Sequence, residues 1–221
     1  DVLFLNEWQK ETYKVFESFP KCAAVSPTPS SKVLKQYTSN VIFENFFSNK
    51  LKFSEVKNPE AMKKFGLSLG NNNFYNDVHL EKYLTINNGE SSAVVGAGHF
   101  VVTYKTNVFK KPQIFYSKFK MGDTLKKVFD EPVLKQGYYR LSTLDNFTYH
   151  LGNTSESWMF EEFDKLKKND EIITVPNLVS KKTNLMMRVI YKLFFNLLSR
   201  KSFWDLFLCW KGLPYKEAKE Y

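Results

Sequence analysis

Hydrophobic and polar positions along the first part of the chain predict strands and helices in alternation. "DVLFL" at the start is typical of the end of a buried strand. Apolar side chains then recur near helical spacing over residues 6–18, and Pro20 is expected to end this helix. "CAAVSPTP" predicts a short strand that runs into a Ser/Pro loop ending near Lys32. Residues 40–48 and 58–66 are expected to be helical, with a loop at "GNNNFYND".

The middle of the chain continues the alternation with a strand that contains glycines. "SSAVVGAGHFVVTY", residues 91–104, is apolar and rich in β-branched residues, and glycine within a strand marks a bulge or a close approach to a ligand. A helix is expected around residues 122–137, with Pro132 beginning its second half and Gly137 ending it. "RLST" and "NFTYHLGN" predict strands, and residues 155–168 predict a helix capped by Ser155. Strands that alternate with helices favour an α/β fold with a mixed sheet.

The segment 182–211 combines apolar residues with basic ones. Leucine and valine recur at every fourth position, while arginine and lysine interrupt them, at Leu185, Val189, Leu193 and Leu197 and at Arg188, Lys192 and Arg200. This pattern predicts a basic amphipathic helix suited to the interface of an anionic membrane. The alternative is a helix that packs back on the rest of the chain with its cations solvated. We expect a division near residue 155, with residues 156–221 forming a helical tail.

Charge and composition narrow the classes of partner and compartment. The formal net charge is +9, and residues 181–221 carry most of the excess, which is typical of a protein with a phosphate-rich partner such as nucleic acid or an anionic membrane. Aromatic residues make up 17% of the chain, enough for a core and for a groove that binds a base or a sugar ring. Cys22 and Cys209 are far apart and predict no disulfide framework or zinc site, which favours a reducing, cytoplasmic location. No run of apolar residues is long enough to predict a membrane span.

Four features with possible chemistry follow one another along the chain. They are Asp1, expected to follow a strand, Gly96-Ala97-Gly98 within a strand, Gly122-Asp123 at the start of a helix and His150 at the end of a strand. This order resembles the GT-A glycosyltransferases, in particular the inverting family 2 enzymes of bacteria. "NEWQKETYKVFESFPKCAAVSPTP" is similar to the helix, strand and Pro-rich loop after that family's metal motif. "GYYRLSTLDNFTYHLGN" resembles its Gly-aromatic pair and last strand, so the resemblance covers roughly residues 1–155.

The resemblance implies a metal-assisted hexosyltransferase with a partial GT-A fold. The final Asp of the family's Asp-x-Asp motif corresponds to Asp1 and its metal-contacting His to His150, which would hold Mg²⁺ or Mn²⁺. Gly96, Ala97, Gly98 and His99 would lie against the donor or the acceptor. The nucleotide-binding first half of the fold is absent from this sequence. We therefore expect a fragment, residues 1–155 being the acceptor side of the catalytic domain, which could be inactive by itself.

The reaction also needs a proton acceptor for the attacking hydroxyl, a role that suits a carboxylate. The family's base corresponds to Asp123, and Asp130 is the second candidate; this sequence lacks the family's usual Glu-Asp pair. Each residue also has a structural alternative. Asp123 could be an acid favoured at a helix N-terminus, the glycines could form a bulge, and His99 could pack beside that bulge.

The expected function is transfer of a sugar, with inversion, from a nucleotide-activated donor to a growing surface polysaccharide or lipopolysaccharide. The acceptor would be a glycan or a lipid-linked glycan at the inner face of the cell membrane. Two alternatives are a basic, aromatic-rich module that binds nucleic acid and a membrane-associated module without catalysis. Nucleic acid is disfavoured because the charge lies in the tail and does not alternate with aromatic residues along a strand. The sequence leaves open the donor sugar, the acceptor, the linkage and the oligomeric state.

Overall fold

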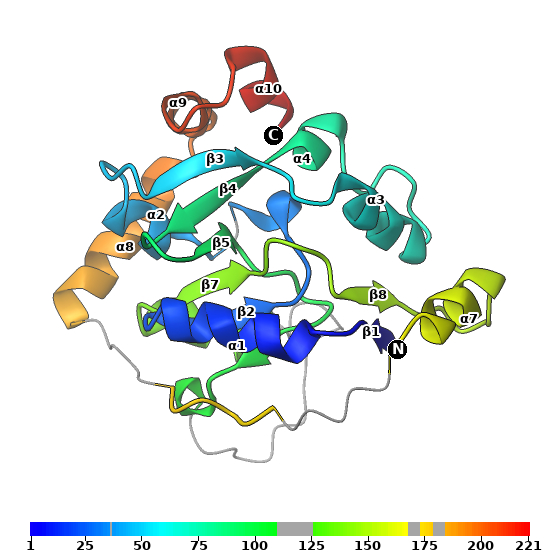
Figure 1. Cartoon of the computed structure of the whole chain (residues 1–221). Helices are drawn as coiled ribbons and strands as arrows, with labels where there is room; N and C mark the ends of the chain where they lie inside the picture. Colours follow the sequence, from blue (N-terminus) through cyan, green and yellow to red (C-terminus); the bar gives the residue numbers. More distant parts are fainter. Residues whose placement is uncertain (36, 110–125, 168–172, 179–183) are drawn as a thin grey trace.

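The structure is a computed structural model that describes residues 1–35, 37–109, 126–167, 173–178 and 184–221 (Figure 1). Its strands are β1 (Val2–Phe4), β2 (Cys22–Ser26), β3 (Leu51–Glu55), β4 (Lys82–Asn87), β5 (Ser92–Val95), β6 (Thr103–Tyr104), β7 (Tyr139–Ser142) and β8 (Thr148–His150). Its α-helices are α1 (Trp8–Ser18), α2 (Ser39–Glu44), α3 (Pro59–Ser68), α4 (Asp77–Glu81), α6 (Glu131–Lys135), α7 (Ser157–Asp164), α8 (Leu185–Leu198), α9 (Lys201–Trp210) and α10 (Tyr215–Glu220). A π-helical turn spans Lys126–Asp130, and short 3₁₀ turns span Ser31–Val33 and Thr106–Val108.

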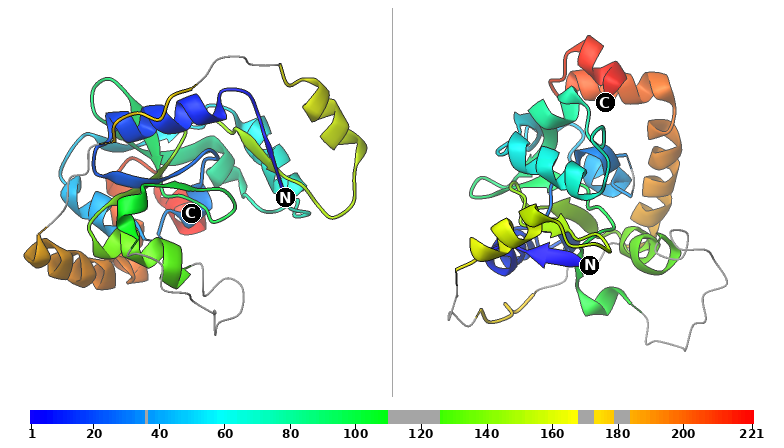
Figure 2. Two further views of the ribbon diagram at one scale, coloured as in Figure 1. Left: turned by 90° about the horizontal axis from the view of Figure 1, so that it is seen from below. Right: turned by 90° about the vertical axis from the view of Figure 1, so that its right-hand side faces the viewer.

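The centre of the fold is a six-stranded sheet in the order β3-β4-β5-β7-β2-β6. β7 and β2 run parallel, and the other neighbours in this sheet are antiparallel. β1 and β8 form a separate two-stranded antiparallel sheet. Every residue of β2 is buried, because α1 lies over one face of the sheet and α2 and α8 lie on the other side (Figure 2). The predicted α/β class with a mixed sheet is confirmed.

The expected strand over residues 91–104 is divided into two strands, so that prediction was wrong. β5 ends at Val95, and Gly96 has a φ of 109°, a backbone conformation that glycine adopts without a steric penalty. The chain then crosses to the far edge of the sheet, where β6 pairs with β2, while β5 pairs with β7. The glycine therefore marks the end of a strand and a change of direction. β3 and β4, which complete the other side of the sheet, were not predicted from the hydrophobic pattern.

Helix ends agree with the sequence where local signals are strong. α1 stops before Pro20, and Gly137, with a φ of 78°, follows α6 as expected. The cap predicted at Ser155 was wrong, because α7 begins after Glu156 and has no side-chain cap hydrogen bond. The first turn of the helix expected over residues 122–137 lies outside the described residues.

The C-terminal segment forms separate helices and not the single helix expected over residues 182–211. α8 ends at Leu198, and the extended conformation of Arg200 starts α9 in a new direction. Leu198, Trp204 and Phe207 are buried in the same hydrophobic cluster as Phe16 of α1 and residues of the central sheet. The expected division near residue 155 therefore separates two stretches that share a core. None of the helices in the described part of the chain is long and apolar enough to cross a membrane.

His79 of α4 is buried beside the C-terminal residue, with its ring centroid 4.7 Å from that of Tyr221. Burial lowers the pKa of His79 to about 4, whereas an unfolded histidine titrates near 6.5. The unfolded chain therefore binds a proton more readily, and the stabilisation present above pH 6.5 is lost as the pH falls toward 4. We expect this residue to account for a loss of about 2–3 kcal/mol between pH 7 and pH 4.5.

Urea unfolding of the protein and of His79→Gln at both pH values measures this contribution. The variant should lose less stability on acidification, because carboxylates elsewhere titrate equally in the two proteins. An identical loss in both would show that His79 is not the group responsible.

Candidate functional site

The turn after β5 lies against the Ser/Pro loop that follows β2. Ser30 Oγ accepts a hydrogen bond from the Gly98 N–H at 2.9 Å, and a Cβ at position 98 would lie only 3.1 Å from that oxygen. A Cβ at Gly96 would lie 3.5 Å from the carbonyl oxygen of Ser30. The close approach that Gly98 permits is therefore to a loop of the same chain, and the glycines lie in a turn after β5 and not in the bulge given as the structural alternative. This packing fixes the position of Ala97 and His99.

Arg140 of β7 carries a charge into the middle of the sheet. Its side chain is 1% exposed, and its guanidinium donates to Asp130 Oδ1 and, at 2.7 Å, to the carbonyl oxygen of Ala97. Tyr104 of β6 donates its hydroxyl to the same carboxylate at 3.3 Å. Burial raises the pKa of Tyr104 to about 12, so the hydroxyl remains a donor at neutral pH. The Asp130 carboxylate thus receives donors from two strands.

His99 lies at the partly exposed side of this cluster. Its Nδ1 is 2.9 Å from Asp130 Oδ2, and its side chain is 28% exposed while that of Asp130 is fully buried. A carboxylate beside one imidazole nitrogen favours a proton on that nitrogen. The arrangement therefore presents a partly exposed imidazole at the surface and keeps the carboxylate buried. In this geometry Asp130 orients His99 and does not itself face solvent.

The small β1/β8 sheet brings the start of the chain beside His150. Val2 lies opposite His150 in the ladder, and the Leu151 N–H donates to the Asp1 carbonyl oxygen at 2.9 Å. Nδ1 of His150 is buried and has no hydrogen-bond partner among the described residues. A buried polar atom without a partner calls for a ligand or an unseen water. The two positions assigned to metal binding thus meet in space through their backbones.

Phe100 connects the two groups of residues. Its ring centroid lies 6.3 Å from that of His150, and it follows His99 directly in the sequence. Gly96 through His99, Asp130 and His150 therefore lie in one neighbourhood at the ends of β5, β7 and β8. Gly122 and Asp123 lie outside the described residues, so their predicted roles stay predictions.

A divalent metal fits this neighbourhood only in part. Asp1 offers a carboxylate and His150 an imidazole, a donor pair that Mn²⁺ accepts. The described residues include no group of three or more His, Cys, Asp or Glu side chains that could hold an ion. Protein sites for Mg²⁺ often supply one or two carboxylates and leave the remaining positions to phosphate and water. Successive residues of a strand point to opposite faces, so Val2 shares a face of the ladder with His150 and Asp1 continues on the other. An ion held by Asp1 and His150 would therefore require the Asp1 side chain to turn around the end of β1.

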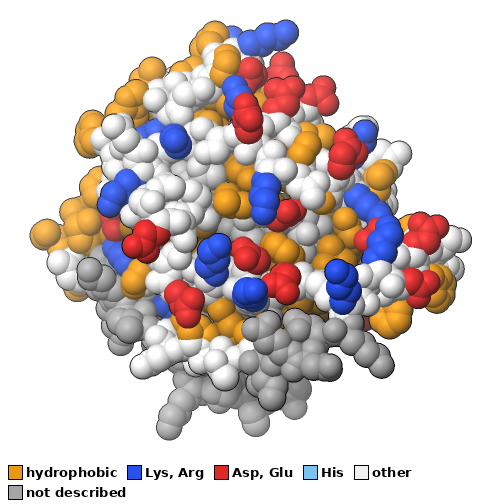
Figure 3. Space-filling view, in the orientation of Figure 1, with side chains coloured by type: hydrophobic (Ala, Val, Ile, Leu, Met, Phe, Trp, Pro, Cys, Tyr) orange, Lys and Arg blue, Asp and Glu red, His pale blue; other side chains and the backbone are white. Residues whose placement is uncertain are grey.

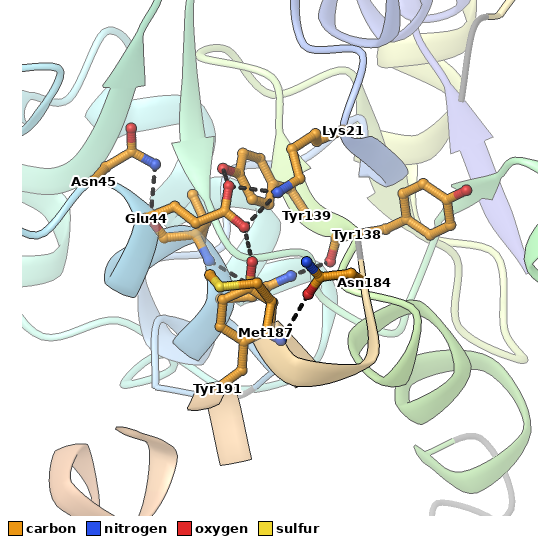
Figure 4. A network of polar contacts seen from close by, with 10 residues as sticks. Lys21, Glu44, Asn45, Tyr138, Tyr139, Asn184, Met187 and Tyr191 are labelled. Carbon is orange, nitrogen blue, oxygen red and sulfur yellow. Dashed lines mark hydrogen bonds and ion pairs between the residues drawn. The ribbon is translucent and has the colours of Figure 1, made fainter. Parts of the chain in front are cut away.

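The sequence reading missed a second polar cluster, which surrounds Glu44 at the end of α2 (Figure 4). The Glu44 carboxylate pairs with Lys21 and accepts hydrogen bonds from the hydroxyls of Tyr139, at 2.5 Å, and Tyr191. Burial and the Glu44 carboxylate raise the pKa of Tyr139, which keeps its hydroxyl protonated. Lys21, Tyr139 and Tyr191 all bind the Glu44 carboxylate, so this cluster joins α8 to α2 and β7. Because these donors occupy the carboxylate, the cluster offers no acceptor to a substrate. No local spacing could have revealed it, because its members come from four separate segments.

Comparison with known proteins adds no relative. No protein-family model, curated protein or solved structure matches this chain. The assignment of function therefore depends on the residues and on their geometry.

Asp130→Asn is expected to lower the free energy of unfolding by about 3–5 kcal/mol, because it leaves the charge of Arg140 buried without its partner. Glu131→Gln is the matched control. It changes the residue that follows Asp130 and removes an exposed ion pair with Lys135. The free energy of unfolding should fall by less than about 1 kcal/mol. Chemical denaturation of both variants measures the difference. Equal midpoints would contradict a structural role for the Asp130–Arg140 pair.

Proposed function

We propose that this protein is a metal-assisted glycosyltransferase of the GT-A type, similar to the inverting family 2 enzymes. It would transfer a hexose from a nucleotide-activated donor to a glycan or lipid-linked acceptor of a surface polysaccharide or lipopolysaccharide. The reaction would take place in the cytoplasm, at the inner face of the membrane. The proposal combines the resemblance of residues 1–155 with the placement of the residues that it singles out.

The observation that carries the proposal is the pairing of β1 with β8. The resemblance assigns Asp1 and His150 to one metal, although they lie at opposite ends of the matching region. The ladder places Val2 opposite His150, with Asp1 immediately before it, and Nδ1 of His150 is left without a partner among the described residues. When bound, a divalent cation would neutralise the charge that develops on the departing diphosphate.

The chain's own residues would divide the remaining tasks. Asp123 is the proposed proton acceptor, on the resemblance alone. Asp130 has its oxygens beside Arg140, Tyr104 and His99, so it suits a positioning role better than that of a base. His99, held by Asp130 and partly exposed, would contact the donor or the acceptor. Phe100, 48% exposed, offers an apolar face of the kind that stacks on a sugar ring.

Release of nucleotide from a panel of nucleotide sugars, with Mn²⁺ or Mg²⁺, tests the activity in the full protein. We expect His150→Ala to reduce metal-dependent turnover by at least about 10-fold, as loss of metal-shell residues typically does. The titration of Mn²⁺ in the presence of nucleoside diphosphate should weaken in parallel. His79→Gln, which changes a buried histidine of α4, is the control and should leave both unchanged.

No nucleotide release from any donor, together with no metal-dependent binding of nucleotide, would contradict the proposed activity. Normal turnover and normal Mn²⁺ titration in His150→Ala would contradict the metal assignment alone.

The proposed base has a test of its own. Asp123→Asn keeps the shape of the side chain and removes the proton acceptor, so turnover is expected to fall by about 10²–10⁴-fold with donor binding retained. Single-turnover kinetics and donor titration separate these effects. His99→Gln should alter acceptor or donor binding with a smaller loss in rate. If His99→Gln abolishes the chemical step and Asp123→Asn does not, the imidazole held by Asp130 is the base.

A further inference from the structure

The outer face of α8 is apolar and exposed. Leu185, Met186, Val189 and Leu193 each expose more than half of their surface. The opposite face is buried, and Tyr191 fixes it to Glu44. A helix with apolar residues on both faces normally lies within a core or against another apolar phase. Packing within the fold therefore accounts for the apolar residues on the inner face of α8 but not for those on its outer face.

α9 and the end of α2 extend this face. Leu206 and Trp210 of α9 and the neighbouring Phe47 are exposed, Phe47 to 88%. Phe46 joins the two helices, with ring centroids 5.5 Å from Phe194 of α8 and 4.6 Å from Trp210. Figure 3 shows hydrophobic side chains along the edge of the molecule where α8 and α9 lie. We call this the α8–α9 surface; its apolar members are Phe47, Leu185, Met186, Val189, Leu193, Leu206 and Trp210.

Cations accompany the apolar residues. Lys192 on α8, Arg200 between the helices and Lys201 at the start of α9 are exposed. Asp205 is the only acid in residues 185–210, and its carboxylate lies 3.9 Å from Lys201. The exposed aromatics of α7, Phe160 and Phe163, differ in this respect, because α7 is rich in acidic residues. An apolar face with a positive border is complementary to anionic headgroups above acyl chains.

We propose that the α8–α9 surface binds the interface of an anionic lipid bilayer. α8 is 14 residues long, which is too short to cross the hydrocarbon core, so it would lie in the plane of the interface. Trp210 at the edge of the surface is the side chain that membrane interfaces favour. The proposal rests on exposure and charge and does not depend on the glycosyltransferase activity. α8 also lies across the molecule from β1 and β8, which carry the proposed metal residues (Figure 1).

Point variants are needed, because removing the C-terminal helices would expose Leu198, Trp204 and Phe207 of the shared core. Leu193→Asp with Leu206→Asp places charges on the apolar face. Lys192→Glu with Lys201→Glu reverses the charge of its border. Phe160→Asp with Phe163→Asp is the matched control, since it makes the same kind of change on α7. Circular dichroism and thermal unfolding establish that each variant is folded.

Co-sedimentation of the full protein with vesicles measures binding. Vesicles that contain phosphatidylglycerol should bind the protein, and vesicles of phosphatidylcholine alone should bind it at least about 10-fold less tightly. Added salt should weaken binding, because exposed charges are screened over about 8 Å at physiological ionic strength. Both variants of the surface should reduce binding to anionic vesicles by about 10-fold or more, and the α7 variant should not.

Three results would overturn the proposal. The first is no binding to anionic vesicles, and the second is equal binding by the surface variants and the α7 control. The third is that sedimentation equilibrium finds a dimer for the unchanged protein and a monomer for the Leu193→Asp/Leu206→Asp variant, while neither protein binds vesicles. That result would assign the surface to a second copy of the chain. Loss of nucleotide release alone would bear on the proposed activity and leave this proposal intact.

Discussion

The charge of Arg140 within the central sheet is the constraint on which the surrounding structure depends. A buried guanidinium is tolerated only when a counter-charge and hydrogen-bond acceptors surround it. Asp130 supplies the counter-charge and the carbonyl oxygen of Ala97 a second acceptor at the terminal nitrogens, while Nε of Arg140 has no hydrogen-bond partner among the described residues. Tyr104 and His99 lie against the same carboxylate. One ion pair thus joins β7 to β6, to the turn after β5 and to the helical turn before α6. The candidate site is built on that junction.

The turn after β5 also affects both the fold and the candidate site. The positive φ of Gly96 redirects the chain, and the hydrogen bond from Gly98 to Ser30 holds the turn against the Ser/Pro loop. The next two residues, His99 and Phe100, then face Asp130 and His150 respectively. Glycines that could be taken for a ligand contact therefore act first on the fold. Their effect on the site is to place the residues that follow them.

Glu44 orients the C-terminal helices. Three donors converge on its carboxylate, and one of them, Tyr191, is on α8. With α8 oriented in this way, Tyr191 and Leu198 point into the fold while Leu185, Val189 and Leu193 point outward. A helix that is apolar on both sides is thereby divided into a core face and a surface face. The residues around His99 and His150 and the α8–α9 surface lie in different parts of the molecule, so changes to one should leave the other folded.

The sequence by itself determined the features that depend on neighbours along the chain. The limits of α1, the strand β2 and the stop at Gly137 follow from apolar spacing, Pro20 and a glycine with positive φ. The mixed α/β class could also be predicted, whereas the roles given to Gly96, Asp130 and His150 stay predictions.

Only the tertiary structure decided which distant segments meet. The division of residues 91–104 between two edges of the sheet, the partner of Arg140 and the exposed face of α8 depend on strand order and helix docking. Strand order and helix docking arise from contacts between residues far apart in the chain. A local pattern of apolar and polar positions does not determine which of these residues meet. The same periodicity in α8 fits a buried helix and an interfacial one equally well, and the docking of Tyr191 on Glu44 determines which side is left exposed.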